Sequence, residues 1–301
     1  MTPKILLLSN NRTERCGVAL VGRHLLQACQ QAGLKMLAWH STPAEPLPAQ
    51  ADEFDIIHVN WHAATVGHLK VQDFPAGPKL SIYVHEPASL CNLVERADLV
   101  IASESKLVGA EPKRLEVLLP PCLDYSPLST WDGAELTLGS TGIRRDGLDW
   151  VAGAVERQHV ELQEQDGPLG FGEVHPGAWR LAPSSQDPDG WLSDEAEIER
   201  LASCAMTVFH YHSGNSGQSY AAMLGVAARR PMLLNHNRML EHLWASPEAQ
   251  EELYVVDDVA SGIYQVVQDL RDGKEKRPWK LAKARSWGRA VEKLGEWWAS
   301  L

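Results

Sequence analysis

The chain has few of the features that mark secreted or membrane-spanning proteins. Its cysteines are five, an odd number, and no two of them have the C-x-x-C spacing. Neither a disulfide scaffold nor a zinc ribbon is therefore expected. No run of about 18 consecutive apolar residues occurs, so the sequence predicts no membrane-spanning helix. The apolar run from Ile5 to Leu8 is too short for a signal peptide, and we expect a cytoplasmic protein.

Positive charge is also scarce. Acidic residues outnumber basic residues by 39 to 28, and the net charge is −11. This balance argues against a surface that binds nucleic-acid phosphates over its whole extent. The exception is the segment 271–301, which holds nine Lys and Arg residues against four Asp and Glu residues. A local contact with an anion remains open there.

Several well-known catalytic motifs are missing as well. The chain has no G-x-G-x-x-G sequence, and Leu148 and Asp149 stand where a P-loop needs Lys and then Ser or Thr. The zinc motif H-E-x-x-H fails at Ser89, which holds the place of its second histidine after His85 and Glu86. Twelve histidines are present, but none lies in a Cys/His cluster at ligand spacing. We therefore predict no metal site.

The residues that are present form a regular α/β pattern. With 301 residues, of which 44% are apolar, the chain is long enough for two domains with separate cores. Short apolar runs predict buried strands at 4–9, 35–39, 55–60, 80–84, 98–102, 115–119, 135–138, 178–182, 207–211 and 231–234. Helical periodicity predicts helices at 18–32, 147–158, 193–202, 217–228 and 279–298. Such alternation is typical of doubly wound parallel sheets.

Two loops of small residues follow predicted strands in the second half. Ser213–Ser219 leads into a helix, where free N–H groups bind phosphate and where Ser216 and Ser219 could add hydroxyl donors. The alternative is a helix cap whose glycines serve only the turn. In the other loop Gly142 is followed by Arg144 and Arg145, which could hold a diphosphate or simply be solvated.

Strand ends and aromatic residues give further candidates. His85 follows a buried strand, although a histidine in that position is commonly only packed or capped. Trp61 and Trp131 fall in predicted loops, where an indole could stack on a sugar or a base. The tryptophans of the last helix are expected to seal it to its neighbour; they are Trp287, Trp297 and Trp298.

In their order along the chain, these motifs resemble those of retaining GT-B glycosyltransferases, close to the large family (glycosyltransferase family 4-like) that includes sucrose and mannosyl transferases. The resemblance covers nearly the whole chain. The segments that carry it are Cys16–Ala19, Asp55–Val59, Tyr83–Glu86, Leu118–Asp124, Gly142–Gly147, Glu197–Val208 and Ser213–Pro231. In the same order, the first four are similar to the family's Cys-Gly turn, its D-hydrophobic-H strand, its strand ending in H-D/E and the segment before its interdomain crossover. The last three are similar to its diphosphate-binding turn, to a helix and strand, and to its donor phosphate loop.

The resemblance implies two Rossmann-like domains with a cleft between them. Residues 1–127 would form the acceptor-side domain, 128–278 the nucleotide-sugar-binding domain, and 279–301 a helix that crosses back to the first domain. It implies transfer of a hexosyl or pentosyl group from a UDP- or GDP-sugar to a hydroxyl acceptor, with retention of configuration. Neither a metal nor another cofactor is implied.

The resemblance also assigns residues to the site. Those implied for catalysis are His85, near the transferred sugar, and Arg144 and Arg145, at the leaving diphosphate. Those implied for donor binding are Gly142, His212, Asn215, Ser216, Gly217, Gln218 and Ser219. Those implied on the acceptor side are Cys16, Gly17, Trp61, His62 and Glu86.

Three positions depart from the family's pattern. Ser216 and Leu224 stand where the family often has a Glu-x7-Glu pair, whose second glutamate usually holds the donor ribose, and Arg229 stands in place of a glycine. One alternative is therefore a non-catalytic nucleotide-sugar- or sugar-binding protein with a decayed transferase site. Another is a two-domain α/β enzyme of a different class, such as a sugar-phosphate epimerase. The acceptor stays open among a metabolite, a glycan, a protein and hydroxymethylated bases in DNA.

Overall fold

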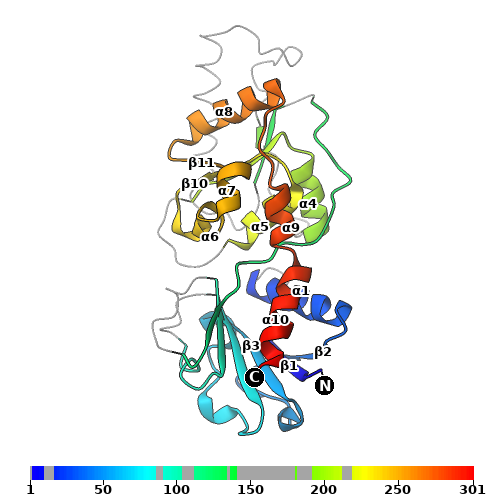
Figure 1. Ribbon diagram of the computed structural model, residues 1–301, viewed down its shortest axis with the longest axis vertical. Helices are drawn as coiled ribbons and strands as arrows, with labels where there is room; N and C mark the ends of the chain where they lie inside the picture. The colour runs from blue at the N-terminus through cyan, green and yellow to red at the C-terminus, as the bar shows by residue number, and fades with distance from the viewer. Residues whose placement is uncertain are drawn as a thin grey trace. The chain divides into compact units, whose positions relative to one another are not determined.

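The computed structural model describes residues 2–9, 17–85, 91–103, 112–133, 136–140, 180–181, 192–211 and 219–301 (Figure 1). These residues form two compact units. Unit 1 consists of the described residues up to Pro121 together with Arg285–Leu301. Unit 2 consists of the described residues from Cys122 to Ala284. Within this described part of the chain, no helix has the length and apolar character needed to cross a membrane.

Unit 1 is built on a parallel sheet with the strand order β2-β1-β3-β4-β5-β6. The strands are β1 (Lys4–Ser9), β2 (Lys35–His40), β3 (Ile56–Trp61), β4 (Lys79–Val84), β5 (Leu99–Ala102) and β6 (Leu115–Val117). Its helices are α1 (Gly17–Gln31), the short α2 (Ala63–Val66) and α10 (Trp287–Ala299), with 3₁₀ turns η1 (Ala51–Glu53) and η2 (Val71–Asp73). Helix α1 ends before Gly33, which has a φ of 77° and thus the left-handed conformation of a helix C-terminus.

The two faces of this sheet have different characters. Along β3, Ile57, Val59 and Trp61 belong to a hydrophobic core on one face. The alternate residues His58 and Asn60 lie on the other face, since successive side chains of a strand point in opposite directions. Helices α1 and α10 lie side by side on that second face (Figure 1). The second face thus carries buried polar side chains beside apolar ones such as Ile5 and Leu7.

Helix α10 is fixed to the polar side chains of this second face through Trp298. The indole Nε1 donates a hydrogen bond to Ser81 Oγ at 3.1 Å, and the ring meets that of His58 edge-on with a centroid distance of 5.1 Å. Ser81 Oγ lies 3.0 Å from His58 Nδ1. Trp287 and Trp298 are buried as expected, whereas Trp297 is only half-buried.

The prediction of a single helix over 279–298 is wrong, because two helices occupy this stretch. Helix α9 (Trp279–Ala284) belongs to unit 2, and α10 belongs to unit 1. Ser286 has an extended backbone and its Oγ accepts a hydrogen bond from Arg289 N at 3.4 Å. A serine N-cap therefore starts a new helix where apolar periodicity alone predicts continuation.

Unit 2 has a second parallel sheet, with the strand order β11-β10-β9-β7-β8. Its strands are β7 (Thr137–Gly139), β8 (Arg180–Leu181), β9 (Met206–Phe209), β10 (Met232–Asn235) and β11 (Tyr254–Val256). Its helices are α4 (Asp194–Ala202), α5 (Tyr220–Ala228), α6 (Glu241–Trp244), α7 (Pro247–Glu252), α8 (Val259–Asp272) and α9, with the 3₁₀ turn η5 (Arg238–Leu240).

Helices cover both faces of the second sheet. Met232 and Leu234 of β10 belong to one core cluster with residues of α4 and α5. Leu233, between them, belongs to another cluster with residues of α8. Both units therefore carry parallel strands, and unit 2 is wound on both faces, as the alternation of apolar runs predicted. Helices α6, α7 and α8 and strand β11 were not predicted from the sequence.

Glu199 of α4 holds the segment at the start of unit 2 in place. Its carboxylate accepts hydrogen bonds from Tyr125 Oη at 2.5 Å, Leu128 N at 2.9 Å and Ser129 N at 2.7 Å. These hydrogen bonds, to Ser129, Tyr125 and Leu128, lower the pKa of Glu199 to about 2. The segment from Tyr125 to Ser129 is thus held by one ionised side chain.

Arg229, which stands where the resembled family has glycine, ends helix α5 in the left-handed conformation with φ 56° and ψ 28°. An L side chain is unfavourable there because its Cβ approaches the following carbonyl oxygen. The Arg229 side chain nonetheless makes contacts: Nη1 donates to Ser126 Oγ at 3.1 Å, and the guanidinium lies 5.1 Å from the centre of the Trp279 ring. These contacts offset part of the backbone cost.

Candidate functional site

His85 lies directly after β4, at the carboxyl end of the unit 1 sheet. Its backbone N–H donates to Trp61 O at 3.3 Å, and its ring Nε2 lies 2.5 Å from Asn60 Oδ1. The ring of Tyr83 packs against it, with a centroid distance of 4.4 Å. The His85 side chain is largely buried, with 8% of the residue exposed. Ligands of parallel α/β sheets bind at this end of the strands.

Asn60, the last residue but one of β3, connects His85 to two other elements. Its Nδ2 donates to Val18 O in α1 at 2.7 Å and to Ser9 Oγ at the end of β1 at 3.3 Å. Asn60 is completely buried, and all its hydrogen bonds lie within unit 1. We refer to Ser9, Asn60 and His85 as the strand-end cluster.

Gly22 of α1 makes room for the strand-end cluster. A Cβ at position 22 would lie 2.4 Å from Ser9 Oγ and 3.0 Å from Asn60 Nδ2. Neither distance is compatible with an ordinary van der Waals contact, so a side chain here would displace the polar groups. Helix α1 can approach the ends of β1 and β3 this closely because residue 22 is glycine.

Burial keeps His85 uncharged. It lowers the pKa of His85 from its ordinary value of 6.5 to about 3, with smaller contributions from His62 and His58. A neutral imidazole carries a proton on one nitrogen and a lone pair on the other. At neutral pH His85 therefore offers hydrogen bonds and no positive charge.

The acceptor-side residues predicted from the sequence have different surroundings. Trp61 was expected in a loop, but it is the last residue of β3 and only 1% exposed, because its indole faces the apolar core of unit 1. An indole buried in this way has no free face for stacking. His62 Nδ1 accepts a hydrogen bond from Ala64 N at 3.1 Å and caps α2. Gly17 is the first residue of α1. Cys16 and Glu86 lie outside the described residues.

In unit 2, side chains at and just after the end of β10 hold the backbone that follows β9. Asn235 exchanges two hydrogen bonds with the main chain of Tyr211: its Oδ1 accepts from Tyr211 N at 3.1 Å and its Nδ2 donates to Tyr211 O at 2.9 Å. Asn237 Nδ2 donates to the same carbonyl at 2.9 Å. Tyr211 lies two residues before the predicted loop Ser213–Ser219, so the chain is anchored next to this end of the loop.

Ser219, at the other end of that loop, caps helix α5. Its Oγ accepts a hydrogen bond from Ala222 N at 3.1 Å and lies 2.7 Å from Tyr211 Oη, while its own N–H donates to Met239 O at 3.3 Å. Helix α5 therefore begins at Tyr220 and not at 217 as predicted, because the serine cap fixes its start. We refer to Tyr211, Ser219, Asn235 and Asn237 as the loop anchor.

The remaining predicted donor residues and the arginine pair lie outside the described part of the chain. They are Gly142, Arg144, Arg145, His212, Asn215, Ser216, Gly217 and Gln218. Leu224, at the place of the family's ribose-binding glutamate, is 7% exposed and packs in an apolar core cluster of unit 2.

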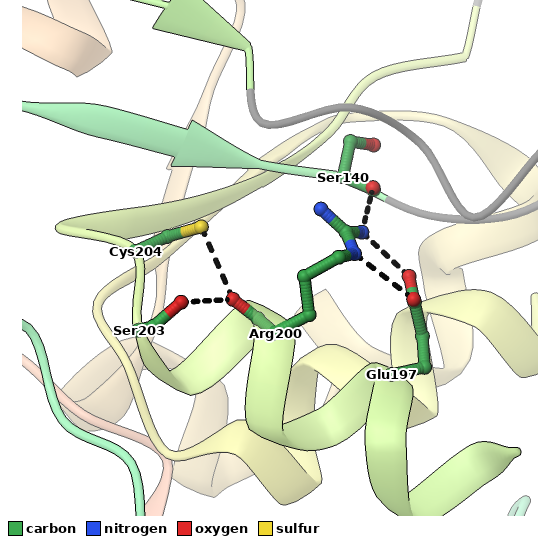
Figure 2. A network of polar contacts seen from close by, with 5 residues as sticks. All are labelled: Ser140, Glu197, Arg200, Ser203 and Cys204. Carbon is green, nitrogen blue, oxygen red and sulfur yellow. Dashed lines mark hydrogen bonds and ion pairs between the residues drawn. The ribbon is translucent and has the colours of Figure 1, made fainter. Parts of the chain in front are cut away.

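Ser140, two residues before the Gly142–Gly147 turn, is held by α4. Figure 2 shows the Arg200 guanidinium between the Ser140 carbonyl and the Glu197 carboxylate. Arg200 Nη2 donates to Ser140 O at 2.6 Å, and Arg200 Nε donates to Glu197 Oε2 at 2.9 Å. Glu197 is 3% exposed, so this ion pair is shielded from water. It fixes the chain where β7 ends.

Sequence reasoning missed Ser9, Asn60, Tyr211, Asn235 and Asn237. Asn60 gave one signal, since it is a polar residue in an apolar run and a buried amide must find hydrogen-bond partners. Among the residues that the structure describes, no group of three or more His, Cys, Asp or Glu could hold a metal ion.

The described fold is similar to solved structures of glycosyltransferases. HepE from Anabaena in complex with UDP-glucose has a TM-score of 0.67 and 15% identity, with 99% of this chain and 100% of that chain covered. Sucrose-phosphate synthase from Thermosynechococcus elongatus has a TM-score of 0.64 and 13% identity, over 99% and 98% of the two chains. An alpha-glucosyltransferase in complex with UDP and a 13-mer DNA has a TM-score of 0.58 and 10% identity, over 99% and 94%.

In sequence, the chain matches no protein-family model and no curated protein. The structural similarity extends over nearly the full length of both chains, and at these identities it establishes the fold. It confirms the fold predicted from the order of the motifs: this chain has the GT-B fold of the glycosyltransferases.

Proposed function

We propose that the protein transfers a sugar from a nucleoside-diphosphate sugar to a hydroxyl acceptor, with retention of anomeric configuration. The observation that carries the proposal is the GT-B fold over 99% of the chain, shared with HepE, whose structure holds UDP-glucose. The anchored ends of 212–218 and the polar strand ends of unit 1 support it. UDP-glucose is accordingly the first donor to test.

The leaving group of this reaction is a nucleoside diphosphate, whose negative charge grows as the glycosidic bond breaks. Fixed donors aimed at that charge stabilise the transition state. We assign this role to Arg144, Arg145 and the N-terminal end of α5, and we propose that no metal is needed. Arg145→Ala should then raise the activation free energy by about 2–4 kcal/mol.

The reaction is tested with purified protein, a panel of UDP- and GDP-sugars and mixed small-molecule acceptors. Mass spectrometry identifies a glycosylated product, and proton NMR of the new anomeric centre distinguishes retention from inversion. Activity should persist in EDTA. Inverted product, or complete loss in EDTA that Mg²⁺ restores, would contradict the corresponding part of the proposal.

A second function is favoured by one observation. Leu224 is buried in an apolar cluster, so this position offers no carboxylate to a ribose. A nucleotide-sugar-binding protein without transferase activity would tolerate that change. Calorimetry that detects UDP-sugar binding, together with no glycosylated product and no donor hydrolysis, would favour this second function.

The acceptor is identified with a panel of candidate compounds. One of the similar structures is an alpha-glucosyltransferase in complex with DNA. Hydroxymethylated DNA therefore belongs in the acceptor panel beside metabolites, glycans and proteins. With a net charge of −11, DNA binding would have to be local.

A further inference from the structure

The hydrogen bonds of Asn60 determine which way its side-chain amide is turned. A backbone carbonyl can only accept, so the atom of Asn60 that lies 2.7 Å from Val18 O must be Nδ2. The oxygen Oδ1 then faces His85 Nε2 at 2.5 Å. An oxygen of this kind can only accept, so the hydrogen atom between these two atoms belongs to His85 Nε2.

We propose that Asn60 is a positioning residue that fixes His85 as the tautomer protonated on Nε2, so that Nδ1 is a lone-pair acceptor for a hydroxyl group of the substrate. The inference rests on the proposed function as far as the substrate is concerned. Its structural part concerns unit 1 alone, because Ser9, Val18, Asn60 and His85 all belong to it.

The rest of the cluster keeps this arrangement in place. Asn60 is held by α1 and by β1, and the His85 ring is held by Asn60 on one edge and by the Tyr83 ring on one side. Within the described residues no hydrogen bond to His85 Nδ1 occurs. The ring thus has one committed nitrogen and one nitrogen left for a ligand.

The chemistry of Nδ1 defines the group that it selects. A bare ring nitrogen accepts a hydrogen bond from a hydroxyl but has no hydrogen to offer a phosphate oxygen. His85 therefore contributes to recognition of the sugar and not of the diphosphate. This distinguishes it from the arginine pair, which recognises negative charge.

The tautomer is tested by long-range proton–nitrogen NMR on protein labelled with ¹⁵N-histidine, with the His85 signals assigned by a His85→Gln variant. The wild type should show a protonated Nε2 and a bare Nδ1 at neutral pH. Ser9→Ala is the matched control, since it removes only the 3.3 Å hydrogen bond and leaves the amide held by Val18. A proton on Nδ1 in the wild type would overturn the proposal.

Two variants test the part of Asn60. Asn60→Leu removes the acceptor, so His85 should become a mixture of both tautomers; an undisturbed single tautomer would count against Asn60. If Asn60→Leu does not fold, Asn60→Asp tests the same contact. The carboxylate still accepts a hydrogen bond from Nε2, and its negative charge should raise the pKa of His85 in an NMR titration. An unchanged titration of His85 in Asn60→Asp would equally overturn the inference.

Binding assays separate this inference from the proposed function. In Asn60→Leu, UDP-glucose should bind about tenfold more weakly, the equivalent of about 1.4 kcal/mol, while UDP should bind as in the wild type. Equal weakening for UDP and UDP-glucose would contradict the contact between His85 and the sugar. Failure of the wild type to bind any nucleotide-sugar would contradict the proposed function, and the tautomer would still be decided by NMR.

Discussion

The two units use asparagine side chains at strand ends in opposite ways. In unit 1, Asn60 bonds another side chain, His85, and so prepares a chemical group. In unit 2, Asn235 and Asn237 bond the main chain of Tyr211 and so fix the path of the backbone. Both arrangements bury amides and satisfy them, which the cost of an unpaired buried polar group requires. The same residue type thus places a side chain in one unit and a loop in the other.

This contrast has an energetic side. The polar side chains of unit 1 lie beneath α1 and α10 and depend on residues that are far apart in sequence, such as Ser81 and Trp298. The loop anchor of unit 2 is assembled from residues 211–239. Substitutions in unit 1 should therefore change chemistry and global stability, whereas those in unit 2 should change a helix start and donor affinity.

The largest effect is expected at Trp298. Trp298→Ala should lower the free energy of unfolding by about 3–5 kcal/mol, because it leaves a large cavity over the sheet of unit 1. Urea denaturation measures this loss. Trp298→Phe keeps most of the packing and removes the hydrogen bond to Ser81, so about 1 kcal/mol should be lost. If Trp298→Ala lowered the free energy of unfolding by less than Trp298→Phe does, α10 would not be packed as described.

Acid should affect the two units in different pH ranges. Burial lowers the pKa values of His58 and His85 to about 3, so each ring is neutral when folded and takes up a proton on unfolding below its ordinary pKa of 6.5. Unit 1 should lose stability as the pH falls from about 6.5 towards 3, by up to about 1.4 kcal/mol per pH unit for each histidine.

In unit 2 the carboxylate of Glu199 has its pKa lowered to about 2 from an ordinary 4.5. Its contribution is complete above pH 4.5 and is lost as the pH falls from there towards 2. Amide hydrogen exchange between pH 7 and 4 resolves the units, and unit 1 peptides should open first. Glu199→Gln should leave the behaviour of unit 1 unchanged. If both units opened together at pH 5.5, the two units would not differ in the pH range over which they lose stability.

Two helix glycines provide a matched pair. Gly22→Ala should displace Ser9 and Asn60, and Gly225→Ala should displace the Phe209 ring, whose nearest atom would lie 2.4 Å from the new Cβ. Each should cost about 1–3 kcal/mol by overpacking. Only Gly22→Ala should also alter the His85 NMR signals. Equal changes of those signals in both variants would remove the functional difference between the units.

Ser219 tests the loop anchor. Ser219→Ala removes the cap of α5 and should cost about 1 kcal/mol in the free energy of unfolding. It should also weaken UDP-glucose binding, whereas Ser219→Thr should retain both properties. Calorimetric titration and thermal unfolding of the three proteins measure these effects. Full donor affinity in Ser219→Ala would show that the cap serves stability alone.

The smallest effect is expected at Arg229. Arg229→Gly relieves the left-handed backbone but loses the contacts with Ser126 and Trp279. Arg229→Ala loses the same contacts without relieving the backbone. The glycine variant should therefore be the more stable of the two by about 1 kcal/mol. If alanine is as stable as glycine, the left-handed conformation is not retained in the variants.

Strands such as β1, β5 and β9 could be predicted because they are buried and therefore read as continuous apolar runs. Strand β11, at the edge of its sheet, was missed. Trp61 was misplaced for a related reason: after Asn60 the run looks finished, and only the register with Val84 of β4 shows that the strand continues. Local sequence carries no record of that pairing. Helices α9 and α10 were merged because apolar and aromatic residues occur on both sides of Ser286, and only the N-cap at Ser286 separates the two helices.

His85 could be predicted as a site candidate because a histidine at a strand end has a definite place in this fold. Its partner could not be predicted, since Asn60 acquires its role from three contacts in β1, α1 and β4. The loop anchor was missed for the same reason: Asn235 looks like an ordinary strand terminus until β9 lies beside it. The spacing of residues along the sequence predicts site residues that lie together in one loop. It does not predict residues that come together only when neighbouring strands pair.

The position of α10 also constrains how the chain can fold while it is being synthesised. Residues up to Pro121 leave the ribosome first, yet Ser81 and His58 obtain their Trp298 contacts only after residues 122–284 have followed. Unit 2 has all its described residues in one stretch and can complete its core earlier. Although domains at the N-terminus generally fold first during synthesis, here the first unit to begin is the last to be finished. A partly synthesised chain would leave the His58 and Ser81 side of the sheet without α10, and so partly open to water, until residues 285–301 are made.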